Sequence, residues 1–376
     1  MKVELVTFIR AYNYGAVLQC YALQTAIQET GVICEVLDYY PSYFRDLYSI
    51  RKDFRWIHPP VKTWINHFML RNTIKMRNKA FNDFINKYIC LSAETYTGKS
   101  DVQTFHSDAD CYIAGSDQVW NYACTYFDPL FFLDFPDANK CKKFSYAACV
   151  GIEKIPEDLV SGYKEKLENY EAYSVREEAS VPLLNDLLQK EIRVDCDPTF
   201  LLEQEQWEKM CNPYIEKDDY IFIYYVEKTK KLQQYAEILA KEKHMKIICV
   251  PCNVAPEVLS GKNDAEFNLE LQLSASPQDI LTYIKNAAYV VTNSFHGTAL
   301  SIIFHKKFIS KVDRESGKIN IRIDDLLRKF DLCSRKMGIC EIEAPIVWKN
   351  IDVTLNALRY KGKEYLSWIM NNANEK

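Results

Sequence analysis

A short buried strand, a sharp turn and a helix follow one another between residues 286 and 305, and this unit strongly constrains the fold. The run from Tyr289 to Thr292 is rich in β-branched residues, as buried strands are, and Asn293 and Ser294 carry side chains that cap helices. Residues 298–305 then place apolar side chains at helical spacing. Strands and helices of this kind alternate along the chain, which predicts an α/β fold with parallel strands.

The N-terminal part of the chain has the same organisation. Residues 3–9 suit a central parallel strand, residues 16–29 an amphipathic helix and residues 32–39 the next strand, which completes a βαβ unit. The turn between strand and helix lacks the GxGxxG pattern, so dinucleotide binding is not supported. Asn13 and Gln19 are candidate contacts for a sugar or a phosphate. Alternatively, Asn13 caps the helix and Gln19 faces solvent.

The alternation continues to the end of the chain. Further strands are expected at 109–114, 143–149, 173–176, 220–226, 246–250, 269–273 and 307–312. Further helices are expected at 156–169, 228–243, 277–287, 319–330 and 352–370. The 376 residues are enough for two domains, and we place the boundary between Pro198 and Lys217.

Composition argues against several classes of function. A net charge of −4 argues against general nucleic-acid binding, and no apolar run approaches the ~18 residues of a membrane span. Residues 1–6 indicate a strand and not a signal peptide, so a cytoplasmic location is expected. The 13 cysteines are scattered, and only Cys249 and Cys252 have metal-like spacing, without a second pair. We therefore expect free thiols and no metal site.

Polar residues follow two of the predicted strands at the end where α/β sheets bind ligands. Asp117 is a candidate for taking a proton from a sugar hydroxyl, and Gln118 and Asn121 are candidates for holding the sugar ring. The alternative is that Asp117 bonds its own backbone in the turn. Arg176 is placed to grip a phosphate or carboxylate, or else to pair with a neighbouring glutamate.

The turn after Thr292 brings a histidine to the start of a helix. Free N–H groups and the helix dipole favour an anion there, and Gly297 lets a ligand approach the backbone closely. The candidates for binding an anionic ligand are therefore Ser294, His296, Gly297 and Thr298. The alternative is that Ser294 only caps the helix and His296 bonds a neighbouring loop.

Five short motifs occur in order along the chain: NYGAVLQ at 13–19, GSDQVWN at 115–121, SVRE at 174–177, DPT at 197–199 and SFHGT at 294–298. Together they resemble the signature motifs of the polysaccharide pyruvyl transferase family, from residue 13 to about residue 330. The resemblance implies an α/β fold with two Rossmann-like domains facing a cleft, as in GT-B glycosyltransferases. The expected domains are 1–205, with a basic helical insertion at about 43–90, and 206–345, followed by a helix at 346–376 that crosses back.

The resemblance also implies a reaction. Such enzymes move the carboxyethylidene group of phosphoenolpyruvate (PEP) onto two hydroxyls of a sugar, in a surface polysaccharide or its lipid-linked precursor, and release phosphate. No cofactor is implied. His296 is then the candidate acid or, alternatively, a phosphate ligand, with Asp117 as the second catalytic candidate. Many members carry arginine where this chain has Ser294, so Arg176, with Arg322 in reserve, is predicted to supply the missing positive charge.

A basic segment lies between Arg45 and Lys79, which contains nine Lys or Arg residues and only two Asp residues. Its interleaved aromatic residues suit an acidic membrane surface or a lipid-diphosphate acceptor, and the alternative is a solvated helical face. Two other functions stay open. One is a GT-B glycosyltransferase that uses a nucleotide sugar, and the other is a non-catalytic sugar-binding relative.

Overall fold

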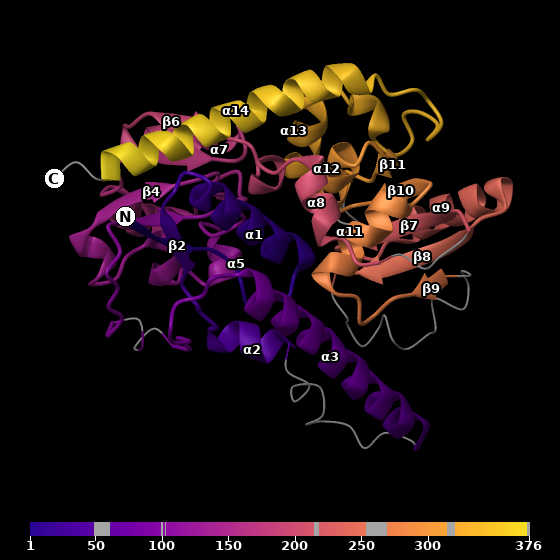
Figure 1. Ribbon diagram of the computed structural model, residues 1–376, viewed down its shortest axis with the longest axis horizontal. Helices are drawn as coiled ribbons and strands as arrows, with labels where there is room; N and C mark the ends of the chain where they lie inside the picture. The colour runs from indigo at the N-terminus through magenta and orange to yellow at the C-terminus, as the bar shows by residue number, and fades with distance from the viewer. Residues whose placement is uncertain are drawn as a thin grey trace.

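The computed structural model describes residues 1–48, 61–98, 101, 103–213, 218–252, 269–313 and 320–373. Two α/β lobes lie side by side, and each is built around a parallel sheet with helices packed against it (Figure 1). This arrangement confirms the predicted fold class. No helix in the described ranges is long and apolar enough to cross a membrane.

In the described ranges, the first domain contains six short parallel strands. Isolated bridges from Phe144 to Ala172 and from Ala148 to Val175 connect a four-stranded sheet to a further strand pair. The side chains of β3 and β5 are entirely buried, as expected of parallel strands covered by helices. In spatial order the strands are β2 (Ile33–Val36), β1 (Lys2–Val6), β3 (Cys111–Ala114) and β4 (Lys142–Ser145), followed by the pair β5 (Tyr173–Val175) and β6 (Ile192–Val194).

Helix α1 (Tyr14–Gln28) follows β1 and begins two residues before the predicted start at residue 16. The Asn13 side chain accepts hydrogen bonds from the N–H groups of Gly15 and Ala16, which caps the helix. Other helices described in this domain are α2 (Ser42–Tyr48), α3 (Val61–Tyr88), α5 (Tyr122–Thr125), α6 (Val160–Leu167) and α7 (Ser180–Leu188), with 3-10 turns η2 (Pro129–Phe132), η3 (Ala138–Lys140) and η4 (Glu157–Leu159).

The second domain has a five-stranded parallel sheet. In spatial order its strands are β11 (Lys307–Ser310), β10 (Tyr289–Thr292), β7 (Tyr220–Tyr225), β8 (Lys246–Pro251) and β9 (Leu269–Leu271). Strand β10 has the predicted bounds. The main helices and turns are η5 (Pro198–Phe200), α8 (Gln204–Met210), α9 (Lys230–Lys243), α11 (Pro277–Asn286), α12 (Phe295–Ile303), α13 (Ile321–Lys329) and η6 (Cys333–Arg335).

The last helix, α14 (Trp348–Ala373), runs across both lobes (Figure 1). The Arg359 guanidinium donates to the carbonyl oxygens of Phe200 and Leu202 at 3.1 and 3.0 Å. Farther along, the Tyr365 hydroxyl donates to the carbonyl oxygen of Ser145 at 3.2 Å, next to β4. The helix thus ties the end of the chain to the first domain.

Helix α3 projects beneath the second domain (Figure 1), and one of its arginines connects the two lobes. Arg77 is buried, and its guanidinium lies 4.5 Å from the centre of the Tyr14 ring. It also donates to the Tyr14 hydroxyl and to the carbonyl oxygens of Pro251 and Cys252. This basic residue is therefore an interdomain contact and not part of a membrane-facing surface. Residues 49–60 of the basic segment lie outside the described ranges, and membrane contact stays a prediction.

Candidate functional site

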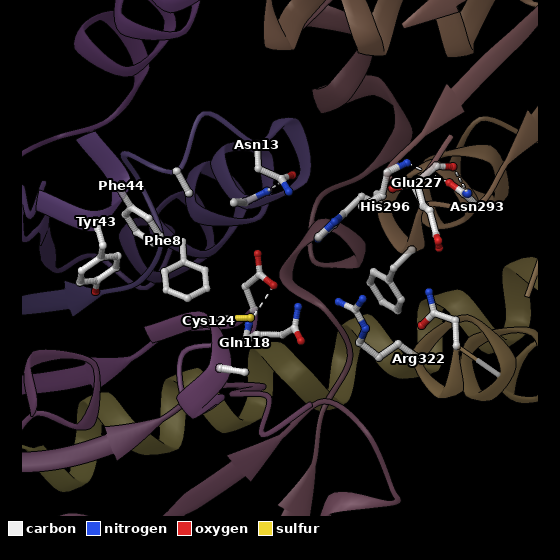
Figure 2. Close-up of a pocket in the computed structure, with 18 of the residues that line it drawn as sticks. Phe8, Asn13, Tyr43, Phe44, Gln118, Cys124, Glu227, Asn293, His296 and Arg322 are labelled. Carbon is white, nitrogen blue, oxygen red and sulfur yellow. Dashed lines mark hydrogen bonds between the residues drawn. The ribbon is translucent and has the colours of Figure 1, made fainter. Parts of the chain in front are cut away.

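A cleft of about 790 Å³ lies between the two domains, at the carboxyl ends of strands from both sheets (Figure 2). This volume falls within the ~300–1,000 Å³ typical of small-molecule sites. Sequence reasoning found six of the residues that line it: Asn13, Asp117, Gln118, Ser294, His296 and Arg322.

His296 lies where the two domains meet. It is the second residue of α12, whose N-cap Ser294 accepts a hydrogen bond from the Gly297 N–H at 3.2 Å. On the other side, the imidazole packs on the start of α1, so closely that a Cβ on Gly15 would lie 1.9 Å from His296 Nδ1. The ring is thus held between two helix N-termini that belong to different domains. It is 7% exposed, and Nε2 has no hydrogen-bond partner in the described part of the chain.

Asp197 is the acidic neighbour of His296. Its Oδ2 lies 3.5 Å from His296 Nε2, which is an ion-pair distance but longer than a normal N–H···O hydrogen bond. The same oxygen accepts from Arg176 Nη1 at 2.8 Å, and Oδ1 accepts from the N–H and the hydroxyl of Thr199 at 3.0 and 2.8 Å. The carboxylate is fully buried, so these contacts fix its position beside the imidazole.

The charge state of Asp197 follows from these contacts. Burial is the largest single influence on its pKa and favours the neutral acid. The charges of His296 and Arg176 and the N–H of Thr199 nevertheless hold the pKa of Asp197 well below its ordinary value. A permanent negative charge therefore faces the imidazole.

Arg176 does not supply the positive charge that was predicted for the cleft. It is 4% exposed, and its guanidinium donates to Glu177 Oε1 and to Asp197 Oδ2, both at 2.8 Å. Two carboxylates thus balance its charge. It lines a separate cavity of about 270 Å³, with its guanidinium 4.5 Å from the centre of the Phe295 ring. Arg176 therefore pairs with Glu177, as the alternative expected, and also holds Asp197, and it does not line the large cleft.

Gly297 and Thr298 also differ from the prediction, since neither lines the cleft. A Cβ on Gly297 would meet Thr292 Oγ1 at 2.5 Å, so this glycine allows close packing of α12 on its own strand and not the approach of a ligand. The Gly297 N–H donates to the Ser294 hydroxyl, and the Thr298 N–H and hydroxyl donate to the Ser294 carbonyl oxygen. The groups expected to contact the donor are thus already used by the helix cap.

Two predicted acceptor contacts have structural roles as well. Gln19 is fully buried, and its Nε2 donates to Thr7 Oγ1 at 3.0 Å, so it neither faces solvent nor reaches the cleft. Asn121 caps α5 through Oδ1 and donates to Gln118 Oε1 at 2.9 Å. Both are corrected, because these amides hold neighbouring loops in place instead of facing the cleft.

Asp117 both bonds the backbone of its own turn and lines the cleft, so the structure fits parts of both alternatives drawn from the sequence. Its carboxylate accepts the N–H of Gln118 at 2.8 Å, which is the local turn bond expected by the alternative. The residue nevertheless lines the cleft, and its φ of 73° is uncommon for a residue with a side chain. Hydrogen bonding between its carbonyl oxygen and the N–H of Cys149 holds this conformation. Backbone strain of this kind concentrates at functional sites.

Sequence reasoning missed residues of the second domain that line the cleft, above all Lys311. Its side chain is 1% exposed and contacts the carbonyl oxygen and carboxylate of Asp313. Lys311 directly follows β11, and its N–H donates to the carbonyl oxygen of Thr292. The sequence signal for this residue is its position: Lys311 is a lysine directly after β11, the strand that pairs with β10. Glu227 and Asn293 also line the cleft, and the Asn293 amide donates to the Glu227 carbonyl oxygen at 2.6 Å (Figure 2).

Several solved structures share this fold. UDP-GlcNAc 2-epimerase from Methanocaldococcus jannaschii, in complex with UDP-GlcNAc and UDP, is 12% identical, with 99% of this chain and 100% of that chain covered and a TM-score of 0.51. UDP-N-acetylglucosamine 2-epimerase from Rickettsia bellii is 11% identical, with 99% of this chain and 95% of that chain covered and a TM-score of 0.51. AviGT4, a glycosyltransferase involved in avilamycin A biosynthesis, is 8% identical, with 100% of this chain and 99% of that chain covered and a TM-score of 0.50. At these identities the likeness shows a GT-B-like fold alone.

Sequence comparison is more specific. A search of curated proteins found no match. A family model described as polysaccharide pyruvyl transferase matches residues 13–311, which include all five motifs and most of the residues that line the cleft.

Proposed function

The chain belongs to the polysaccharide pyruvyl transferase family, and we propose that it transfers the carboxyethylidene group of PEP onto two hydroxyls of a sugar acceptor. The observation that carries this proposal is the buried His296, set between the N-termini of α1 and α12 at the interdomain cleft and next to the carboxylate of Asp197. The acceptor is a sugar of a surface polysaccharide or of its lipid-linked precursor.

The donor is proposed to lie against the second domain. PEP carries a phosphate and a carboxylate, which require cationic partners. Lys311 and Arg322 line the cleft on this side, and the start of α12 contributes the positive end of a helix dipole. Arg322 forms no ion pair within the described ranges, so its guanidinium is available to an anion. Arg322 therefore replaces Arg176 in the role left open by Ser294, and Lys311, which is paired with Asp313, adds positive charge to the same wall of the cleft.

The reaction needs two proton movements. One sugar oxygen attacks C2 of PEP while C3 receives a proton and becomes a methyl group. The C2–O bond to phosphate then breaks, and the second sugar oxygen bonds to C2 and closes the ketal. Of the two hydroxyl protons, one balances the new methyl group and the other leaves on phosphate. No oxidant or reductant takes part.

His296 is the proposed acid that delivers the proton to C3. Asp197 lies 3.5 Å from Nε2 of the imidazole, where its negative charge can balance an imidazolium, while Arg176 and Thr199 keep that carboxylate in place. Asp117, across the cleft, is the proposed base for the first sugar hydroxyl. A neutral imidazole left after transfer can accept the second hydroxyl proton, and the proton taken up by Asp117 leaves on phosphate, so both residues return to their starting state.

His296→Asn tests this role. General acid catalysis typically contributes ~10²–10⁴-fold, so we expect turnover of PEP, measured as phosphate release, to fall by about that factor. PEP binding, measured by calorimetry, should change much less, because asparagine keeps a polar side chain of similar bulk. His305→Asn is the matched control, since His305 follows the same helix and pairs with Asp352 outside the cleft.

The outcomes separate the alternatives. Parallel loss of PEP binding and turnover would make His296 a phosphate ligand, and normal turnover in His296→Asn would refute the mechanism. Release of a nucleoside diphosphate from a nucleotide sugar, with no consumption of PEP, would identify a glycosyltransferase instead. Glycan binding with turnover of neither donor would identify a non-catalytic relative.

A further inference from the structure

The two walls of the cleft differ in chemistry. Among the described residues that line it, the cationic and imidazole side chains, His296, Lys311 and Arg322, all come from the second domain. The wall from the first domain contributes no Lys or Arg in these ranges and is rich in aromatic rings. We call Phe8, Tyr43, Phe44 and Tyr126 the aromatic wall. An anionic substrate therefore suits one wall and a neutral one suits the other.

The rings of the aromatic wall form a connected surface. The Tyr43 and Tyr126 ring centres are 5.0 Å apart at an interplanar angle of 58°, and Tyr43 lies 4.8 Å from Phe44. Phe44 in turn meets Phe8 edge-on at 5.5 Å. Figure 2 shows Phe8, Tyr43 and Phe44 on one side of the cleft and His296 and Arg322 on the other, with Asn13 and Gln118 between them.

Tyr126 is the exposed member of this wall, and its backbone is unusual. Its side chain is 68% exposed, while Phe8 and Phe44 are buried and support the wall from behind. Tyr126 and Phe127 have φ of 51° and 55°, two consecutive left-handed residues that carry side chains. Such a conformation is strained for a residue with a side chain and persists only where its surroundings enforce it. The Phe127 ring, packed 5.0 Å from Tyr163, provides that support.

Tyr43 is fixed by a hydrogen bond as well as by ring contacts. Its hydroxyl donates to Asp128 Oδ2 at 3.4 Å, and the Tyr39 hydroxyl donates to the same oxygen at 2.7 Å. Asp128 is buried and also caps the 3-10 turn η2 through the Leu130 N–H. The faces of Tyr43 and Tyr126 are thus set before any ligand arrives, which lowers the entropy lost on binding.

We propose that the aromatic wall binds a neutral pyranose ring of the acceptor, with the C–H face of the sugar against Tyr126 and Tyr43. Aromatic rings offer an apolar surface for that face, and the amides of Asn13 and Gln118 offer partners to the hydroxyl edge. Asp117 also lines the cleft from the first domain, beside the aromatic wall, where a base for a sugar hydroxyl is needed. The proposal deepens the proposed function, because it assigns the acceptor to the first domain, opposite the donor.

The test uses the full chain and a set of probes. Methyl glycosides of glucose, galactose, mannose and N-acetylglucosamine are titrated into wild type, Tyr126→Phe and Tyr126→Ala, and saturation-transfer NMR reports which sugar protons touch protein. We expect at least one glycoside to bind through its ring C–H protons and to bind about 3- to 10-fold more weakly to Tyr126→Ala. Tyr126→Phe keeps the ring and should bind as wild type does. PEP affinity should be equal in all three proteins.

Several results would overturn the proposal. They are equal glycoside binding in Tyr126→Ala, absence of binding of every glycoside by wild type, and loss of PEP affinity together with that of the glycoside. If UMP binds in place of the glycosides and depends on Tyr126, the wall holds a nucleobase. Failure of the proposed function looks different, because glycosides would then bind as expected while PEP is not consumed with any of them.

Discussion

At the scale of single residues, the site depends on charges that water cannot reach. Asp197 is fully buried, yet contacts with Arg176, Thr199 and His296 keep it ionised. Its pKa is lowered on folding, so it stabilises the protein above the unfolded pKa of ~3.9, and this contribution is lost as pH falls through the folded value. The pair that serves the proposed chemistry therefore also contributes to stability at neutral pH.

Glu4 is a second buried carboxyl group, and it has the opposite effect. Burial raises the pKa of Glu4 to about 7, a donor from Ser107 lowers it, and the nearby charge of Glu35 raises it. The folded protein thus binds a proton more tightly than the unfolded chain, so this contribution is complete below the unfolded pKa of ~4.3 and is lost as pH rises to about 7. Glu4 is expected to destabilise the protein at pH 8.

Glu4→Gln should remove that penalty. We expect the variant to gain on the order of 3 kcal/mol in the free energy of unfolding at pH 8 and little at pH 4.5, measured by urea denaturation. Glu165→Gln, an exposed position on α6, is the control and should not change the pH dependence. A Glu4→Gln protein that is no more stable than wild type at pH 8 would show that Glu4 ionises without cost.

Residue types alone could predict only part of the site. Asn13, Asp117, Gln118 and His296 line the cleft because they follow strands at the carboxyl edge of a sheet, which the sequence pattern shows. The sequence could not show in which direction an amide or a guanidinium points. Arg176 is turned inward by two carboxylates, one of them 21 residues away, and that partnership exists only in the fold.

At the scale of elements, the sequence predicts the bounds of β10 better than the start of α12. The bounds of β10 agree with the prediction, whereas α12 begins at Phe295, three residues before the predicted start at Thr298. The glycine in its first turn is a poor helix former and carries no apolar side chain, so the periodic pattern starts late. The Ser294 cap begins the helix regardless of that pattern.

Arg77 gives a prediction at this scale, because it fastens α3 to the loop after β8. Arg77→Met keeps the apolar stem but leaves buried carbonyl oxygens without a donor. Hydrogen bonds from charged groups contribute about 1.5–3 kcal/mol each, so the free energy of unfolding should fall by at least about that amount. Arg71→Met, an exposed position on the same helix, should cost little in the same urea titration. Equal stability of the two variants would contradict the role given to Arg77.

At the scale of the whole molecule, one apolar core extends through both domains. It includes Leu5 of β1, Trp207 of α8, Phe222 of β7 and Leu366 of α14. Domains that share a core should unfold together, so tryptophan fluorescence and far-UV circular dichroism are expected to give a single, coincident urea transition. Two separated transitions would mean that the lobes are held together only weakly. The two-sheet plan follows from the sequence, but this shared core comes from contacts between distant segments.

The contact between Gly15 and His296 has a consequence for related chains. Helix α1 itself does not require a glycine at position 15, because this residue lies in the first turn of an ordinary helix. A Cβ at this position would overlap the imidazole, so we expect a side chain here to displace the ring and to disturb the two sheets much less. A relative that carries the histidine but has a larger residue in place of Gly15 would therefore keep the architecture and lose the geometry. This single position offers a criterion for sorting transferases from proteins that only resemble them.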